Sequence, residues 1–119
     1  MARSLTEIWE ELDRQYAKGR NASAEQFLQE AIQEMEQEHG KESREVASLL
    51  NEQGGLHREF GQYDMAEREF TQAKNILGRL VGENHPDYIT TVNNLAGLYR
   101  RQNRFAEAKA LFQEVLHHY

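Results

Sequence analysis

Cysteine is absent from the 119-residue chain, and no stretch approaches the length of an apolar membrane span. The first absence excludes disulfides, a thiolate nucleophile and a cysteine-ligated zinc site. The second excludes a membrane-spanning helix, because crossing a bilayer takes roughly 18 or more apolar residues in succession. The N-terminal sequence MARSLTEIWEELDRQ also lacks the apolar segment of a secretory signal. We therefore expect a soluble, cytoplasmic protein with no membrane partner.

Positive charge is also scarce in this chain. Fourteen basic residues stand against twenty acidic ones, which gives a formal net charge of -6. Because a negatively charged protein repels phosphate backbones, nucleic acid is not an expected partner. The length fits one domain, which we expect to span residues 1–119.

Between its few glycines and its one proline, the chain shows helical periodicity throughout. The pattern predicts an all-α protein without strands. Six helices are expected, at residues 4–18, 23–39, 44–60, 64–81, 86–102 and 105–118. Ser43 is expected to cap the third helix, Pro86 to begin the fifth, and Ser23 with Gln26 to form a capping box at the second.

An internal repeat with a period of 42 residues runs through most of the chain. Asn51 and Gly55, for example, recur as Asn93 and Gly97. Each unit corresponds to one helical hairpin, and stacked hairpins bury a core that a single hairpin cannot. Further pairs at this spacing are Ala24 and Ala66, Leu28 and Phe70, Leu50 and Val92, Tyr63 and Phe105, Ala66 and Ala108, and Phe70 and Phe112.

These residues resemble the tetratricopeptide repeat, whose helix A favours Trp, Leu, a small residue and Tyr, and whose helix B favours Ala, an aromatic residue and Ala. The phrases HPDYITTVNNLAGLY and RFAEAKALFQEVL are similar in particular to the kinesin-light-chain-like subgroup. The matching residues are Trp9, Leu12, Tyr16, Ala24, Leu28 and Ala31, then Leu50, Gly54, Ala66, Phe70 and Ala73, then Val92, Leu95, Ala96, Tyr99, Ala108, Phe112 and Val115.

The resemblance implies a right-handed α-α superhelix, a solenoid of about three helical hairpins. Its units are expected at roughly 4–40, 43–82 and 85–119, and the chain is either a whole array or a fragment of a longer one. Three residues depart from the family pattern: Asp13 replaces a small residue, Gln53 replaces Leu and His57 replaces Tyr. We expect these departures to change local packing rather than the fold.

Few residues offer the chemistry of an active site. The histidines, His39, His57, His85, His117 and His118, are scattered over helix ends and different faces, and no HExxH sequence accompanies them. Acidic pairs on a helical protein form a solvated face, and the chain has no nucleophile motif or glycine-rich phosphate loop. We therefore expect no enzyme, no metal site and no cofactor.

A polar stripe lies on the face of helix A that does not pack into the core. The resemblance implies that this face lines a concave groove for a protein or peptide ligand. An asparagine amide can donate to and accept from a peptide bond, so Asn93 is the stronger candidate contact and Asn94, at the margin, the weaker one. The alternative is that these asparagines bond to a neighbouring helix or to water. The candidate groove residues are Ser48, Asn51, Gly55, Arg58, Thr90, Asn93, Asn94, Gly97, Arg100 and Arg101.

Two glycines on this stripe need an explanation, because a mid-helix glycine costs about 1 kcal/mol relative to alanine. Either neighbouring helices approach closely at Gly55 and Gly97, or the missing side chains leave room for a peptide. The basic cluster nearby, Arg100, Arg101 and Arg104, pairs either with a partner or with acidic neighbours in the solenoid, or simply favours a helix C-terminus.

The last predicted helix carries apolar residues that nothing further along the sequence covers, namely Leu111, Val115, Leu116 and Tyr119. Repeat arrays usually need a polar capping element at such an end. Either the array continues, or the surface pairs with a second copy. A homodimer through the C-terminal helix, acting as a structural or assembly element, is therefore the alternative function.

Overall fold

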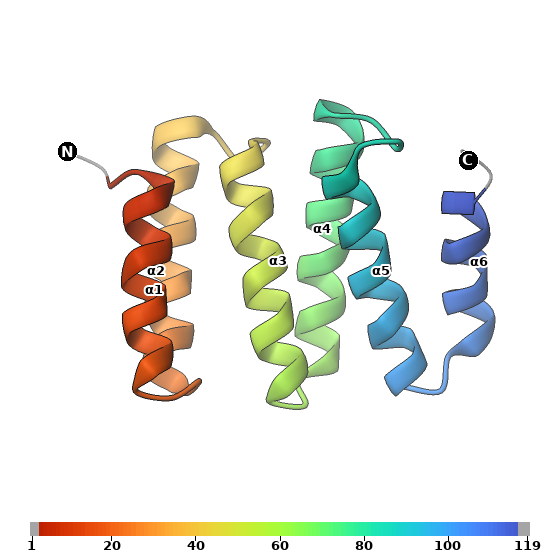
Figure 1. Ribbon diagram of the computed structural model, residues 1–119, viewed down its shortest axis with the longest axis horizontal. Helices are drawn as coiled ribbons and strands as arrows, with labels where there is room; N and C mark the ends of the chain where they lie inside the picture. The colour runs from red at the N-terminus through yellow and green to blue at the C-terminus, as the bar shows by residue number, and fades with distance from the viewer. Residues whose placement is uncertain (1–2, 117–119) are drawn as a thin grey trace.

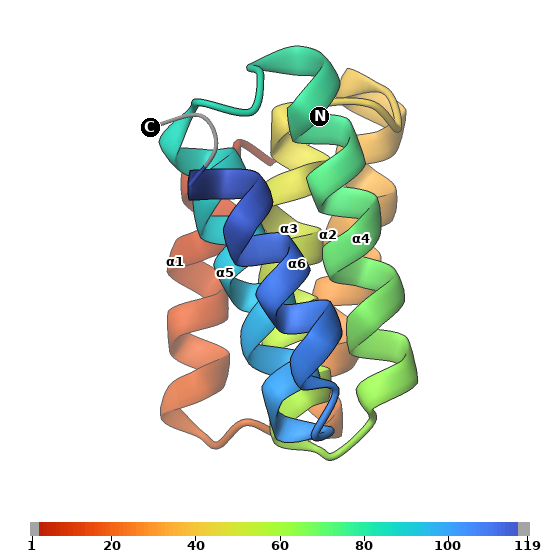
Figure 2. The ribbon, with the colours of Figure 1, turned by 90° about the vertical axis from the view of Figure 1, so that its right-hand side faces the viewer.

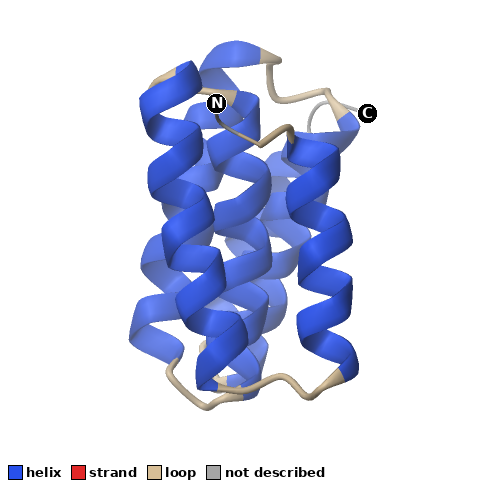
Figure 3. Ribbon diagram, turned by 90° about the vertical axis from the view of Figure 1, so that its left-hand side faces the viewer, coloured by secondary structure: helices blue, strands red, loops and turns tan. Residues whose placement is uncertain are grey.

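The computed structural model describes residues 3–116, which form six α-helices (Figure 1). These residues contain no strand, as the periodicity predicts (Figure 3). Every predicted helix boundary within the described residues agrees within one residue. The predicted end of the last helix at 118, the end of the third unit at 119 and Tyr119 lie outside the described residues. The helices are α1 (Leu5–Ala17), α2 (Ala22–His39), α3 (Arg44–Glu59), α4 (Tyr63–Leu80), α5 (Pro86–Arg101) and α6 (Phe105–Leu116).

Consecutive helices pack against one another and build a solenoid two helices thick. Seen from its C-terminal end, α1 and α5 lie on one side of the stack and α2 and α4 on the other (Figure 2). The molecule measures 42 × 29 × 19 Å, and its shortest dimension equals about two helix diameters of roughly 10 Å. α3 also contacts α5 directly, so the first helices of successive hairpins share a surface.

Two of the three predicted helix starts are confirmed. The Ser43 hydroxyl caps α3, and Pro86 occupies the first turn of α5. The predicted capping box of Ser23 and Gln26 is wrong, because α2 begins earlier. The side chain of Asn21 accepts hydrogen bonds from the backbone N–H groups of the first turn instead, a role that asparagine fills as well as serine does.

A close approach between α3 and α4 depends on Gly54. A Cβ atom at this position would lie 2.6 Å from the ring of Phe70, a separation that real atoms do not tolerate. Phe70 is fully buried and packs with Ala66 of its own helix and with Leu95 and Leu98 of α5. In the second hairpin, a residue without a side chain on α3 and an aromatic ring on α4 therefore form the close contact between the two helices.

His57, which stands where the family has tyrosine, is completely buried. Its Nε2 lies 2.5 Å from a carboxylate oxygen of Glu25 on α2, and its Nδ1 lies 2.6 Å from one of Glu69 on α4. Because each ring nitrogen faces a carboxyl group, both hydrogen bonds form together only when the ring carries two protons or one carboxyl group carries a proton. This departure from the family pattern joins three helices.

The contrast between two adjacent glycines is testable. Gly54→Ala should lower the free energy of unfolding by about 1–3 kcal/mol, because the buried ring of Phe70 cannot move away. Gly55→Ala should raise it by about 0.5–1 kcal/mol, because an added Cβ there meets nothing within 4 Å and alanine favours the helix. Urea denaturation of both variants checks this, and equal effects would contradict the assignment of Gly54 to the helix contact.

The buried carboxyl group of Glu69 predicts a pH dependence. Burial raises its pKa above the ordinary value of 4.5, although the hydrogen bond with His57 works in the opposite direction. The folded state therefore binds this proton more tightly than the unfolded state, and Glu69 contributes stability at low pH that is lost as the pH rises through its raised pKa. Glu69→Gln lacks this loss, so its unfolding free energy relative to wild type should increase as the pH rises above 4.5.

The matched control is Glu67→Gln. A hydrogen bond from Arg104 lowers the pKa of Glu67, so this residue contributes stability that is present above its unfolded pKa and lost as the pH falls. The relative stability of Glu67→Gln should consequently decrease as the pH rises. Denaturant titrations at a series of pH values measure both trends, and a parallel trend for the two variants would contradict the role given to Glu69.

Candidate protein-binding groove

The α3–α5 groove lies between the first helices of the second and third hairpins and consists of two pockets. The first, which we call the Arg44 pocket, has a volume of about 250 Å³. An ion pair between Arg44 and Asp87, with 2.9 Å between nitrogen and oxygen, connects its two walls. Both side chains are about half exposed, so this pair adds little stability and remains accessible. The pocket is lined by Arg44, Ser48, Asn51, Leu77, Asp87 and Thr90.

The second pocket, which we call the Arg58 pocket, has a volume of about 230 Å³. Its lining comes from four places in the chain: the turn between α1 and α2, and the helices α3, α4 and α5. Asn51 belongs to both pockets and therefore lies between them. The lining residues are Arg20, Asn51, Glu52, Gly55, Leu56, Arg58, Glu59, Phe70 and Asn94.

The orientation of the Asn51 amide follows from its neighbours. Thr91 donates its hydroxyl proton to the backbone carbonyl of Asp87 at 2.9 Å. The Thr91 oxygen can then only accept, so it must be the NH₂ group of Asn51 that lies 2.7 Å away. The carbonyl oxygen of Asn51 is consequently fixed as the other end of the amide, and this atom is buried without a hydrogen-bond partner.

Arg58 provides a buried donor in the same pocket. Its guanidinium lies over the ring of Phe70, 5.9 Å from the ring centre. The Nε atom is buried without a hydrogen-bond partner. Within residues 3–116, this atom and the carbonyl oxygen of Asn51 are the buried side-chain atoms in that condition, and both belong to residues of the Arg58 pocket. An unsatisfied buried polar group costs about 1–3 kcal/mol.

The other charged groups of the Arg58 pocket already have partners. Arg20 bonds to Glu59 at 2.8 Å and lies over the ring of Tyr16. Glu52 accepts a hydrogen bond of 2.8 Å from the hydroxyl of Tyr16. Burial, followed by this bond, raises the pKa of Tyr16 above its ordinary value, so the hydroxyl keeps its proton at neutral pH.

The two glycines of the predicted stripe leave open space. A Cβ atom at Gly55 or at Gly97 would meet nothing within 4 Å. Close helix approach, one of the two explanations considered for these residues, is therefore wrong at both positions, and the close approach occurs one residue earlier, at Gly54. At Gly55 the open space belongs to the Arg58 pocket.

The structure brings together six of the ten predicted groove residues. Those six are Ser48, Asn51, Gly55, Arg58, Thr90 and Asn94. Asn93 is exposed on α5 outside both pockets, so the weaker of the two candidate asparagines is the one that lines the groove. Arg100 and Arg101 are exposed in the last turn of α5, and Gly97 also lies outside both pockets.

Sequence reasoning missed several groove residues. Arg44 and Asp87 lie one turn before Ser48 and Thr90, so extending the stripe toward the helix starts would have found them. Arg20 comes from a neighbouring turn, and no helical spacing relates it to α3. Its place in the pocket depends on how the first hairpin packs.

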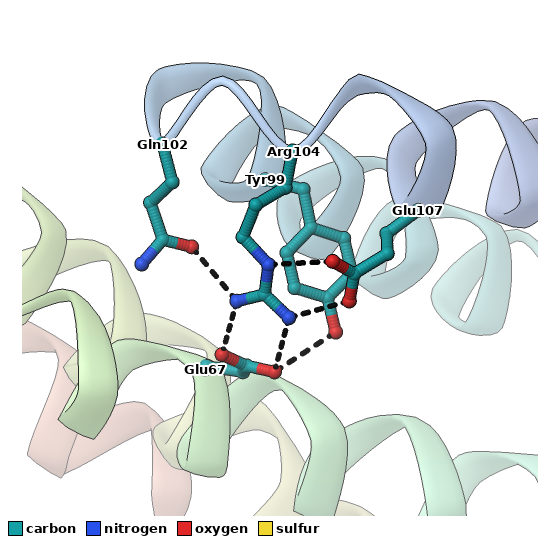
Figure 4. A network of polar contacts seen from close by, with 5 residues as sticks. All are labelled: Glu67, Tyr99, Gln102, Arg104 and Glu107. Atoms are coloured by element: carbon teal, nitrogen blue, oxygen red, sulfur yellow. Dashed lines mark hydrogen bonds and ion pairs between the residues drawn. The ribbon is translucent and has the colours of Figure 1, made fainter.

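Arg104, the third member of the basic cluster, is occupied within the solenoid (Figure 4). Its guanidinium bonds to Glu67 at 2.7 Å and to Glu107 at 2.5 Å, and lies 4.2 Å from the ring centre of Tyr99. The hydroxyl of Tyr99 donates to the same Glu67 at 3.0 Å. Burial and this bond raise the pKa of Tyr99 to about 12. The alternative in which Arg104 pairs with acidic neighbours is the observed one.

The described residues form neither a three-residue metal site nor a membrane-spanning helix. Among the described residues, no group of three histidine, aspartate or glutamate side chains is placed to hold a single metal ion. In the same part of the chain, no helix combines the length and the apolar character needed to cross a bilayer.

Comparison with known proteins agrees with the paired helices and the repeated spacing. The model of the tetratricopeptide repeat matches residues 15–79 and again residues 45–119. The chain belongs to the tetratricopeptide repeat family. Members of this family are non-catalytic repeat proteins that interact with other proteins. The two matches together cover residues 15–119, from the end of α1 onward.

Individual relatives share only part of their length with this tetratricopeptide repeat protein. The crystal structure of BtubC (BKLC) from P. vanneervenii superimposes with a TM-score of 0.77 at 24% sequence identity, over 85% of this chain and 40% of that one. This similarity concerns the fold. A protein of Pyropia yezoensis named "Uncharacterized protein ycf37" is 31% identical over 71 residues, which are 60% of this chain and 35% of that protein.

Proposed function

We propose that this protein is a non-enzymatic interaction module that binds a segment of a partner protein in the α3–α5 groove. The observation that carries this proposal is the meeting of six polar or small stripe residues from two helices around two connected pockets. Membership of a family that interacts with proteins supports it. Neither pocket contains a paired nucleophile and base, so the groove offers recognition rather than catalysis.

The groove chemistry favours a peptide chain as the ligand. Asn51 and Asn94 carry amides, and Ser48 and Thr90 carry hydroxyls, so each can serve as donor or acceptor. Such groups recognise the main chain of a segment largely independently of its side chains. The Arg44–Asp87 pair spans the groove with balanced charge and does not require a strongly charged ligand.

Three finer assignments belong to the same proposal. We propose that the chain belongs to the kinesin-light-chain-like subgroup, and the 42-residue period and the phrase HPDYITTVNNLAGLY support this. The three units at 4–40, 43–82 and 85–119 act as one scaffold domain. We also propose that the protein acts in the cytoplasm, which a chain without cysteine fits.

Peptides that bind the wild-type protein are first selected from a displayed random library. Their binding to alanine variants then tests the groove. Asn51→Ala and Asn94→Ala should each weaken binding about tenfold, because each leaves a peptide polar group unpaired. Asn93→Ala, outside the pockets, should have the smaller effect. Gln33→Ala and Gln37→Ala, which are exposed on α2 and lie outside both pockets, are the controls. Equal losses in groove and control variants, with unchanged circular dichroism, would contradict the proposal.

A second candidate function is self-association through α6. This helix exposes 60% of Phe105 and 68% of Leu116. Together with the partly buried Phe112, they line an apolar hollow of about 390 Å³. Because a lone apolar patch of this kind marks an interaction surface, a homodimer through the C-terminal hairpin is the specific alternative.

Sedimentation equilibrium at tens of micromolar distinguishes the alternatives. If self-association is the function, the wild type sediments as a dimer and Phe105→Glu as a monomer, because the charge cannot be buried in an apolar contact. Lys41→Glu, exposed in the turn between α2 and α3, controls for charge alone. A wild-type monomer rules out the dimer. Loss of peptide binding in Asn51→Ala without a change in sedimentation supports the groove.

A further inference from the structure

The hydrogen bonds of His57 require one more proton than a neutral ring between two ionised carboxyl groups provides. A neutral imidazole has a single N–H, so it can donate to only one carboxylate. The completely buried ring lies 2.5 Å from an oxygen of Glu25 and 2.6 Å from an oxygen of Glu69. The two bonds therefore exist together only while these three residues, which we call the histidine triad, hold one extra proton.

The histidine triad connects the first hairpin to the second. Glu25 lies in the first turn of α2 and His57 in the last turn of α3, at the end of the molecule where the chain turns from α1 to α2 and from α3 to α4 (Figure 1). Arg20 and Glu59 also connect these hairpins, but their side chains are 49% and 43% exposed, so their pair contributes little. Breaking a buried contact between charged groups costs more. Of these polar contacts, the junction therefore depends more on the triad.

The groups around the triad determine how firmly it holds the proton. Burial raises the pKa of Glu69, and this effect outweighs the opposing effects of the bond with His57 and of the positive charge of Arg68. Glu25 is the more exposed of the two carboxyl groups, at 23% against 13%. Other charged or titratable groups at this junction have partners of their own: Tyr16 of α1 bonds to Glu52, Arg20 of the following turn bonds to Glu59, and Arg58 lies over the ring of Phe70.

We propose that the histidine triad is a proton-dependent connection, which holds the first hairpin on α3 while it retains the extra proton and releases that hairpin when the proton is lost. Without the proton, one carboxylate faces a ring lone pair, and the carboxylate that water reaches more easily moves away. That residue is Glu25, which belongs to the first hairpin, whereas Glu69 stays beside His57 within the second. The proposal concerns the junction between the hairpins and does not depend on what the α3–α5 groove binds.

The dependence of stability on pH tests the proton count. A histidine in the unfolded chain loses its proton near pH 6.5, as a rough value, so the triad stabilises the fold fully below this pH and less as the pH rises. Between about pH 7 and 8.5, the unfolding equilibrium constant of the wild type should rise about tenfold per pH unit relative to that of Glu25→Gln. This variant needs no extra proton, because its NH₂ group donates to the ring and the neutral ring donates to Glu69.

Matched variants complete these urea titrations. Glu38→Gln removes an exposed carboxylate from the same helix, and His39→Gln removes an exposed histidine; both should keep the dependence of the wild type. Glu69→Gln provides the same donor on the other side of the ring, so it should lose the dependence as Glu25→Gln does, and it replaces that variant if circular dichroism shows that Glu25→Gln does not fold. A wild type that changes with pH in parallel with these glutamine variants overturns the proposal.

Hydrogen exchange of the wild type tests the release of the first hairpin without any variant. Between about pH 6.5 and 9, amide protection in α1 and α2 should fall at least about tenfold more than in α4 and α5, because only the first hairpin loses a connection. Comparing helices within one protein cancels the rise of the intrinsic exchange rate with pH. An equal fall in all helices overturns the proposal, because the proton then affects the whole fold and not the junction.

Discussion

The contact between the ring of Phe70 and the backbone of Gly54 sets the position of the second hairpin. A side chain at Gly54 would lie 2.6 Å from this ring, so the two helices reach their observed separation only because the residue has none. The same ring packs against Leu95 and Leu98, so it also fixes the position of α5 relative to α4. The guanidinium of Arg58 lies 5.9 Å from the centre of this ring. The spacing of the hairpins and the base of the groove thus depend on one buried aromatic residue.

The helix-A position where the family has tyrosine is packed in two different ways in the three units. In the first and third units, a tyrosine of helix A lies under an arginine of the following turn: Tyr16 under Arg20 and Tyr99 under Arg104. The second unit has His57 instead, fully buried between carboxyl groups of α2 and α4. The ring thereby joins α3 to the preceding hairpin and to its own partner helix, because an imidazole has two nitrogens that can form hydrogen bonds in different directions, whereas a phenol has one hydroxyl.

Periodicity and turn chemistry made the fold accessible from the sequence. Helix boundaries followed from apolar spacing and from residues such as Ser43 and Pro86, whose effects are local. The error at Ser23 arose because Asn21 competes for the same backbone N–H groups, and the spacing alone does not rank two adjacent caps. The groove stripe was also accessible, since residues three and four apart share a helix face. The sequence did not reveal which of the two asparagines enters the groove, because Asn93 and Asn94 differ by one step of about 100° around α5.

The sequence by itself determined an all-helical repeat protein, its family and the face of helix A that carries amides and hydroxyls. These properties follow from local preferences and from a spacing repeated along the chain. Only the tertiary structure decided that Gly54 serves packing and Gly55 leaves space. It also decided that the amide of Asn51 donates to Thr91 of α5 and that Arg20 lines the Arg58 pocket. Contacts between hairpins depend on three-dimensional separation and hydrogen-bond direction, and the spacing of residues along a single helix specifies neither.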